Sequence, residues 1–123
     1  MKNLIIDAAN EKIFFSIITD KQSYTTKHTN SRENFDKFMN LILIFLKKNK
    51  TNLDDIRRIF VNRGPGKFSG VRISIATAKA ISLSKNINLI GFDSKILKNG
   101  GYKKLLELDK KNLLIKNLIK PIY

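Results

Sequence analysis

Polar and apolar positions along the chain follow two periods, one typical of strands and one typical of helices. Residues 3–7, 12–19 and 23–28 read as three strands joined by short turns, which predicts an antiparallel meander. Residues 59–61 and 88–93 read as two further strands, and each follows a helical segment. Strands joined by helices should be parallel, with right-handed crossovers. The pattern predicts an α/β fold, with helices packed on a mixed five-stranded sheet of β-β-β-α-β-α-β order.

The first helical segment begins at Ser31 and continues to about residue 49. Acidic residues lie near its start and lysines near its end, as the helix dipole prefers. Leu41, Leu43 and Ile44 lie outside its main apolar stripe, so the segment has more apolar surface than a monomeric surface helix needs. The main stripe, which should face the core, consists of Phe35, Phe38, Met39, Ile42, Phe45 and Leu46.

A second helix is predicted over residues 69–84, with the hydroxyl of its first residue as a cap. Its apolar residues cover most of its circumference, and Arg72 and Lys79 mark one narrow polar strip. Such a helix is buried on more than one side. Ala76 and Ala80 are four residues apart, so another helix could approach closely there. Two neighbouring helices with surplus apolar surface suggest a helical partner from another chain.

The segment between the fourth strand and this helix is rich in glycine. Residues 62–80 read NRGPGKFSGVRISIATAKA. This motif resembles the corresponding stretch of the bacterial TsaB (YeaZ) family, and the resemblance extends from residue 4 to about residue 94. It implies one RNase-H-like half of the actin-like ATPase and sugar-kinase superfamily. Family members usually carry His followed by Ser or Thr in the first turn of the first helix, where this chain has Asn34 and Phe35.

The resemblance also predicts how the chain is divided. We expect residues 1–94 to form the RNase-H-like N-terminal domain of TsaB type. Residues 95–123 should form a short C-terminal remnant, a helix plus a tail, that is not an independent domain. Gly100 and Gly101 should break or delay that helix, which is predicted over residues 94–108.

Family members have a second, similar half, and kinases of the superfamily bind nucleotide between two such halves. The remaining stretch of about thirty residues is too short to build a domain. We therefore expect no autonomous kinase and no cofactor bound by this chain alone. The resemblance leaves open a nucleotide at a subunit junction.

The formal net charge of +14 suggests a polyanion as a partner. The charge is mostly lysine and is spread along the chain without interleaved aromatic residues, which is usually a solvated surface. The abundance of Lys, Ile and Asn is typical of an AT-rich coding sequence, so we favour compositional drift over a dedicated nucleic-acid face. The chain has no cysteine for disulfides or thiolate chemistry. It shows no signal peptide or bilayer-length apolar run, so we expect a cytoplasmic protein with no membrane contact.

The glycine turn supports two interpretations. It could offer free N–H groups to an anion, or it could simply let two backbone segments approach each other, which we favour. It lacks the Walker A order because Phe68 separates Lys67 from Ser69. Arg63 and Arg72 flank it and could bind a phosphate or a partner's carboxylate, or pair with local acids. The residues of the turn are Arg63, Gly64, Pro65, Gly66 and Gly70.

Two titratable residues are candidates for chemistry. Asp7 ends the first strand, where the superfamily can place a carboxylate at the phosphate and metal site; because Ala8 and Ala9 follow, we favour a turn cap. His28 is the only histidine, and without a Ser or Cys partner in a motif it makes no triad. No cluster of carboxylates or histidines suggests a metal. We predict no catalytic residue and no metal site, and nothing supports a peptidase.

The resemblance implies a non-catalytic accessory subunit. Its partner would be a TsaD-type transferase, which moves a threonylcarbamoyl group to adenosine 37 of tRNA. A TsaE-type ATPase would join the assembly, and tRNA would be bound through the complex. The two helices would form the heterodimer interface, or a homodimer when the chain is alone. The predicted interface residues are Phe35, Phe38, Leu41, Ile44, Phe45, Arg72, Ile75, Ala76, Lys79 and Ala80.

A charged residue at Leu41 or Ala76 should abolish pairing while the monomer stays folded. The alternative function is a small basic RNA-binding module that acts directly on tRNA, with binding that falls steeply with salt and needs no protein partner. A kinase-type enzyme is a third hypothesis, which the missing second half disfavours.

Overall fold

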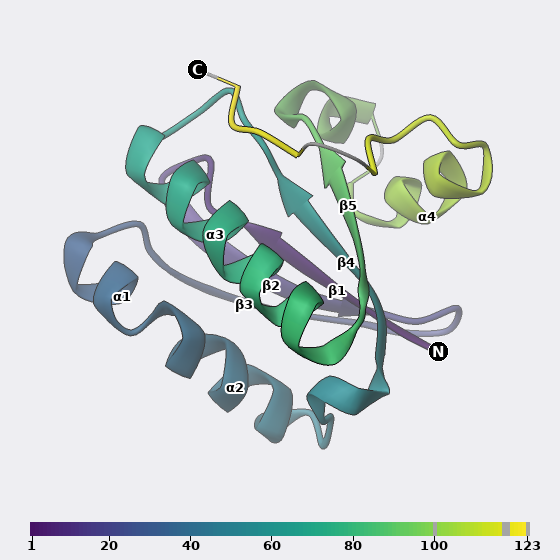
Figure 1. Ribbon diagram of the computed structural model, residues 1–123, viewed down its shortest axis with the longest axis horizontal. Helices are drawn as coiled ribbons and strands as arrows, with labels where there is room; N and C mark the ends of the chain where they lie inside the picture. Colours follow the sequence, from purple (N-terminus) through teal and green to yellow (C-terminus); the bar gives the residue numbers. More distant parts are fainter. Residues whose placement is uncertain (100, 117–118, 123) are drawn as a thin grey trace.

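Five strands pair into one mixed sheet in the computed structural model, which describes residues 1–99, 101–116 and 119–122 (Figure 1). The strands are β1 (Lys2–Asp7), β2 (Lys12–Ile18), β3 (Ser23–Thr29), β4 (Ile56–Asn62) and β5 (Asn88–Phe92). They lie in the order β3-β2-β1-β4-β5. β1, β2 and β3 pair antiparallel, whereas β4 is parallel to both β1 and β5. The predicted meander and the predicted parallel strands are confirmed.

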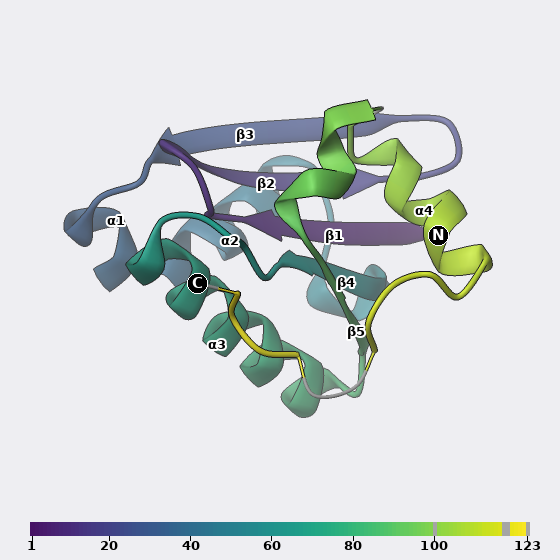
Figure 2. The same cartoon turned by 90° about the horizontal axis from the view of Figure 1, so that it is seen from above.

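Helices α1 (Arg32–Asp36), α2 (Phe38–Lys48) and α3 (Phe68–Lys85) cover one face of the sheet (Figures 1 and 2). Alternate residues of the central strands point to this face, among them Ile6 of β1 and Val61 of β4, both 0% exposed. They belong to one apolar cluster with Ile42 of α2 and Ala78 of α3. The main core therefore lies between the sheet and these helices.

The helical pattern at residues 31–49 forms two helices, so the prediction of a single helix is wrong. Ser31 caps α1, since its Oγ accepts a hydrogen bond from the backbone N–H of Asn34 at 3.3 Å. Lys37 then leaves the helical conformation, with φ −119° and ψ 26°. The ring of Phe38, the first residue of α2, packs edge-on against Phe15 at 5.3 Å. The sequence hides the break because apolar residues continue at helical spacing across it.

The start of α3 also differs from the prediction. The helix begins at Phe68, and Lys67 precedes it without a side-chain cap, so the predicted cap at Ser69 is wrong. The backbone fixes this end instead, because the N–H of Lys67 donates to the carbonyl oxygen of Ala9 at 2.7 Å. The turn after β1 thus positions the start of α3.

A 3-10 helix, η2 (Ser94–Asn99), and helix α4 (Lys103–Lys110) follow β5. Gly101 lies between them with φ +65°, a conformation that favours glycine; Gly100 lies outside the described residues. The predicted interruption of the helix over residues 94–108 is confirmed. Leu105 of α4 is 0% exposed and belongs to a second apolar cluster with Phe60 and Ile90, so α4 covers the other face of the sheet.

The tail after α4 returns along β5. The N–H of Gly91 donates to the carbonyl oxygen of Ile115 at 2.7 Å, which forms an isolated antiparallel bridge. Ile119 is 3% exposed and packs in the main core. The N–H of Ile122 donates to the carbonyl oxygen of Arg63 at 2.6 Å. The tail, drawn in yellow in Figure 1, therefore links the edge strand to the glycine turn.

Candidate functional site

One side of α3 stays exposed along its whole length. Its inner side packs on the sheet through residues such as Ala78 and Ile81, which are 0% and 1% exposed. The outer residues recur at helical spacing and include Phe68 and Leu83, which are 54% and 85% exposed. Between them lie the small residues Ala76 and Ala80. The result is an exposed stripe with a large apolar side chain at each end and small residues beside Arg72 and Lys79 between them.

Helix α2 adds two exposed apolar side chains, one on the flank toward α3 and one on the flank toward β3. Leu43 is 42% exposed and, with Lys85, lines an open hollow of about 410 Å³ between α2 and the end of α3. Ile44 is 55% exposed and lines a second hollow toward β3. We call the exposed side of α2 and α3 the helical face; its residues are Leu43, Ile44, Phe68, Arg72, Ala76, Lys79, Ala80 and Leu83.

The N-terminal end of α3 forms a hollow of about 420 Å³ on this face. Phe35 of α1 lines it together with Phe68, Arg72 and Ala76 of α3. The guanidinium carbon of Arg72 lies 5.1 Å from the centre of the Phe68 ring, a cation–π contact. The hollow therefore offers aromatic, aliphatic and cationic groups side by side, a composition typical of protein interfaces.

The structure divides the predicted interface residues into two groups. Phe35 is half-buried at the hollow, and the exposed members all lie on the helical face. The other members are part of this chain's own core and are 3–9% exposed: Phe38, Leu41, Phe45 and Ile75. A charge at Leu41 would therefore disturb the folded monomer, so the prediction that it blocks pairing without unfolding is corrected and kept for Ala76 alone.

Sequence reasoning left Leu43, Phe68 and Leu83 out of the predicted interface. Leu83 had a signal, since it lies seven residues after Ala76 and so on the same side of the helix. Phe68 had none, because it reads as part of the glycine turn. Leu43 had a signal as well, since it lies outside the main apolar stripe of its helix.

The glycine turn is pressed against the turn that follows β1. A Cβ added to Gly66 would lie 2.2 Å from the carbonyl oxygen of Ala9, and one added to Gly70 would lie 2.1 Å from that of Ala8. Both distances are far shorter than any real contact of a Cβ atom, so only glycine fits at either position. The geometry supports the interpretation we favour, in which the glycines let two backbone segments approach.

The two arginines near this turn have different surroundings. Arg63 is bound to the tail, since its Nε donates to the carbonyl oxygen of Lys120 at 3.2 Å. Arg72 lies on the helical face, above the ring of Phe68. The structure therefore does not bring the two guanidinium groups together around one anion.

Asp7 holds together three segments that are far apart in the sequence. Its Oδ1 accepts hydrogen bonds from the side-chain amide of Asn62 at 3.0 Å and from the N–H of Ala9 at 3.3 Å. Its Oδ2 accepts one from the hydroxyl of Tyr102, at the start of α4, at 2.8 Å. Asp7 is 2% exposed. The bond to Ala9 is the turn cap that we favour, and the bond to Tyr102 ties α4 to the sheet.

These contacts give Asp7 a part in holding the fold together. Burial raises the pKa of the Tyr102 hydroxyl, and the nearby carboxylate of Asp7 raises it further as a charge and as a hydrogen-bond acceptor. The hydroxyl therefore keeps its proton and continues to donate. Among the described residues, no group of three or more His, Asp or Glu side chains could hold a metal ion.

His28 lies on β3 beside a hydrophobic ring and two lysines. Its ring centre is 5.9 Å from that of Phe15. Burial lowers the pKa of His28, and the positive charges of Lys37 and Lys48 lower it further. Tyr24 and Thr26 line the same hollow as His28 and supply hydroxyls, but no described carboxylate lines it to orient the imidazole as a triad requires.

Comparisons with known proteins show what this chain is similar to. Residues 17–96 match the family model described as TsaD: tRNA N6-adenosine threonylcarbamoyltransferase. The tRNA threonylcarbamoyladenosine biosynthesis protein TsaB of Buchnera aphidicola subsp. Schizaphis graminum is 31% identical over 91 residues, which cover 74% of this chain and 43% of the relative. The protein of the same name from Escherichia coli K12 is 28% identical over 116 residues, which cover 89% and 50%. The chain spans about half the length of the curated relatives it matches.

The fold is similar to that of YeaZ from Pseudomonas aeruginosa, with a TM-score of 0.72 over 90% of this chain and 50% of that chain. The sequence identity is 15%, so this likeness concerns the fold alone. The predicted RNase-H-like class is confirmed. Within the described residues, no helix combines the length and the apolar character that a membrane span requires.

Proposed function

Because this chain belongs to the family that the TsaD model describes and within it matches TsaB (YeaZ) proteins, we propose that it is a non-catalytic subunit that pairs with a TsaD-type transferase. The transferase would carry out the threonylcarbamoylation of adenosine 37 of tRNA. This chain would supply contacts that stabilise the competent conformation of the transferase, and no reacting groups.

The helical face is the observation that supports this proposal most. Exposed apolar side chains that lie together on a surface mark sites of protein interaction, and Leu43, Phe68 and Leu83 are all at least 42% exposed. Ala76 and Ala80 would let a partner helix approach α3 closely. The face therefore fits a partner that contributes helices of its own.

The surroundings of the candidate catalytic groups support a non-catalytic role. Both carboxylate oxygens of Asp7 accept hydrogen bonds from groups that hold the fold together. His28 lies beside two cations, and the pKa of its imidazole is lowered. A subunit that works through contacts needs neither group to react.

The proposal includes further members of the assembly. A TsaE-type ATPase would join the complex, tRNA would be bound through it, and the assembly would work in the cytoplasm. A nucleotide would bind at a subunit junction and not to this chain alone. Without the transferase, a second copy of the chain could cover the helical face, because self-association would bury the same residues.

A small basic RNA-binding module that acts directly on tRNA is the second candidate function. Its support is the net charge of +14. That charge does not account for the exposed apolar residues of α2 and α3, so we place the RNA-binding function second.

Two matched substitutions test the pairing. Leu83→Asp places a charge on the helical face, whereas Leu113→Asp places the same charge at a residue outside it; the two leucines are 85% and 63% exposed. Binding of each variant to the transferase from the same organism would be measured by titration calorimetry. We expect Leu83→Asp to weaken binding by about 30-fold or more, because burying a charge in place of an apolar contact residue of an interface costs about 2 kcal/mol or more.

The control should bind within about two-fold of the unmodified chain, since surface substitutions away from special features change little. Circular dichroism would show that both variants are folded. Equal binding by both variants and the unmodified chain would rule out the helical face as the interface.

A further inference from the structure

Ion pairs offset part of the lysine charge on one side of the sheet. On the side of α1–α3, three lysines have exposed acidic partners, and such pairs reduce the local positive charge. They are Lys37 with Glu33 at 3.9 Å, Lys67 with Glu11 at 3.1 Å and Lys85 with Asp54 at 3.4 Å.

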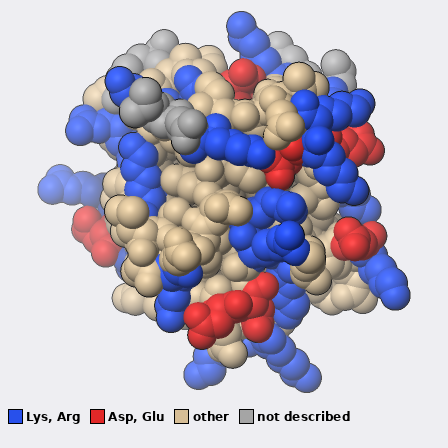
Figure 3. All heavy atoms as spheres, turned by 45° about the vertical axis from the view of Figure 1, so that its right-hand side comes forward, with Lys and Arg blue, Asp and Glu red and all other residues tan. Residues whose placement is uncertain are grey.

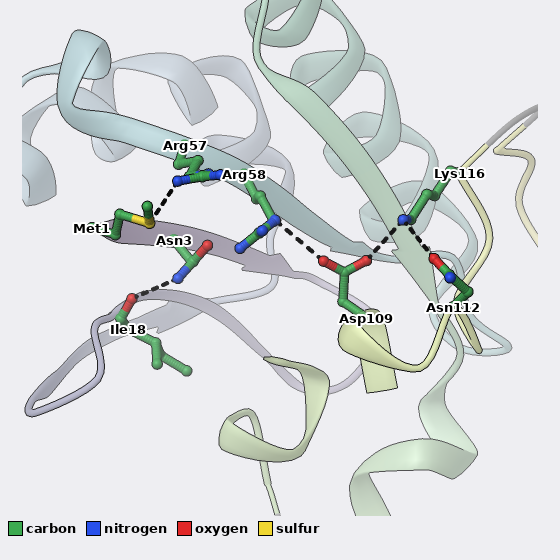
Figure 4. A network of polar contacts seen from close by, with 8 residues as sticks. All are labelled: Met1, Asn3, Ile18, Arg57, Arg58, Asp109, Asn112 and Lys116. Carbon is green, nitrogen blue, oxygen red and sulfur yellow. Dashed lines mark hydrogen bonds and ion pairs between the residues drawn. The ribbon is translucent and has the colours of Figure 1, made fainter. Parts of the chain in front are cut away.

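Helix α4 carries two acidic residues, Glu107 and Asp109, and one of them is buried. Asp109 is 8% exposed. Its carboxylate lies 3.2 Å from the Nε of Arg58 and 3.4 Å from the Nζ of Lys116 (Figure 4). Two cations already surround this carboxylate, so it cannot offset the charge of further lysines.

Four lysines on α4 and directly after it form no ion pair with any described carboxylate. We call them the α4 lysine cluster: Lys103, Lys104, Lys110 and Lys111. Each lies three or four positions from Glu107, so the five side chains share one side of the helix. Leu105 occupies the opposite side and is 0% exposed. In Figure 3, which turns this part of the molecule forward, Lys and Arg side chains project from much of the surface.

The cluster has the geometry of an extended cationic surface. Two lysines lie at each end of α4, and the helical rise of 1.5 Å per residue separates the two pairs by about 10 Å. The single exposed carboxylate of Glu107 lies between them. The surface therefore keeps a net positive charge along its length.

We propose that the α4 lysine cluster binds the phosphate backbone of RNA. Lysine ammonium groups are compact charges that suit phosphate oxygens, and contacts to the backbone position a protein without reading sequence. We therefore expect binding that depends on salt and little on sequence. The inference rests on the proposed function in one respect, because it identifies the RNA as the tRNA on which the complex acts.

The location of the cluster is compatible with pairing. Helix α4 packs with the second apolar cluster of the sheet, whereas α2 and α3 pack with the first. The α4 lysine cluster and the helical face consequently lie on opposite sides of the sheet, and Figure 2 shows α4 and α3 well apart. RNA and the transferase could bind at the same time.

An anionic membrane is the competing polyanion, and the structure favours RNA over it. A helix that lies on a membrane inserts its apolar side. The apolar side of α4 is already used, since Leu105 is buried and Leu106 and Leu108 pack against the same cluster. Leu113, 63% exposed, is a small apolar contact by comparison.

The test compares two variants with the same change of net charge. In one, Lys103, Lys104, Lys110 and Lys111 are all replaced by Gln. In the control, four exposed lysines are replaced by Gln, all outside the cluster and outside the helical face: Lys12, Lys21, Lys27 and Lys50. Binding to an unmodified tRNA transcript would be followed by fluorescence anisotropy between 50 and 200 mM salt, with the chain alone.

Four phosphate contacts give a slope of log K against log salt of about −3 to −4, or a loss of about 50- to 150-fold in affinity over that range. We expect tRNA binding by the cluster variant to lose this dependence on salt, and tRNA binding by the control variant to keep most of it. Equal losses in the two variants would show that only net charge matters and would overturn the proposal. Binding to phosphatidylserine vesicles without binding to tRNA would overturn it in favour of a membrane.

A second readout separates this inference from the proposed function. Titration of the cluster variant with the transferase should give the affinity of the unmodified chain, because the helical face is intact. If pairing persists and tRNA binding is unaffected by the substitutions, the inference fails and the proposed function stands. If tRNA binding depends on the cluster and no pairing is found, the proposed function fails.

Discussion

The hydrogen bond between Tyr102 and Asp7 offers a sharp test of how the fold is held together. It joins residues 95 positions apart and connects the start of α4 to the end of β1. Tyr102→Phe removes only the hydroxyl and keeps the ring, which packs beside Phe92 with a centre-to-centre distance of 6.5 Å. The substitution therefore isolates the hydrogen bond from the packing.

The size of the effect follows from what Asp7 retains. A hydrogen bond to a charged group contributes about 1.5–3 kcal/mol. After the substitution, the buried carboxylate still accepts bonds from Asn62 and from the N–H of Ala9, so it is not left unsatisfied. We expect a loss of about 1–2 kcal/mol in the free energy of unfolding, or a midpoint lowered by about 0.5–1 M urea at a typical slope of about 2 kcal/mol/M.

The pH dependence of the free energy of unfolding tests the same contact independently. The pKa of Tyr102 is raised in the folded protein, whereas in the unfolded chain it takes its ordinary value of about 10. The stability that the protonated Tyr102 hydroxyl contributes is thus fully present below about pH 10. It is lost as the pH rises from there through the folded-state pKa of Tyr102. The unmodified protein should lose up to about 1.4 kcal/mol per pH unit more than the Phe variant above pH 10.

Urea unfolding at pH 8, 9, 10 and 11 measures both effects. Both proteins share every other ionisable group, so the difference between the two curves reports Tyr102. Tyr24→Phe is a matched control, because its hydroxyl donates to the exposed side chain of Gln22, and it should change the midpoint little. Identical midpoints and identical pH profiles for the unmodified protein and Tyr102→Phe would refute the reasoning.

Two further predictions concern the turn and the buried ion pair. Gly70→Ala should lower the free energy of unfolding by about 1–3 kcal/mol, because the added Cβ would overlap the carbonyl oxygen of Ala8. This cost should exceed the gain of about 1 kcal/mol that alanine brings to a helix. Thermal unfolding would compare this variant with Ser69→Ala, which should change stability by less than about 0.5 kcal/mol. Asp109→Ala should also lower the free energy of unfolding by about 1–3 kcal/mol, because it leaves the half-buried Arg58 without its partner at 3.2 Å. Amide hydrogen exchange should rise first in α4, and unchanged exchange there would contradict this prediction.

The sheet could be predicted because its signals are local. Short turns between the first three strands allow only antiparallel pairing, and the glycine-rich turn marks the passage from β4 to α3. The close approach of the turn to another segment was also predictable from its glycines. Its neighbours, Ala8 and Ala9, were not, because nothing in a local pattern names a partner some sixty residues away.

The helices show where periodicity stops being informative. Apolar residues cover α3 nearly all round, so the pattern cannot distinguish Ile75, which is 4% exposed, from Leu83, which is 85% exposed. The break at Lys37 is hidden for a related reason, since the apolar spacing continues through it. Burial depends on which side meets the sheet, and that is decided by tertiary packing.

The spatial distribution of charge is another feature that could not be predicted from the sequence. Along the sequence the lysines look evenly spread, which favours compositional drift. In the structure, Asp109 turns inward to Arg58 and Lys116, and the neighbouring lysines are left without acidic partners among the described residues. Linear counting cannot separate a buried carboxylate from an exposed one, so the burial of Asp109 next to these lysines is visible only in three dimensions.

Size-exclusion chromatography with light scattering, on this chain alone and mixed with the TsaD-type transferase of the same organism, tests the central claim most directly. The account predicts a stable one-to-one complex with the mass of the two chains together. A chain that elutes apart from the transferase at concentrations well above micromolar, but shifts with tRNA, would contradict the accessory-subunit function and favour the RNA-binding module.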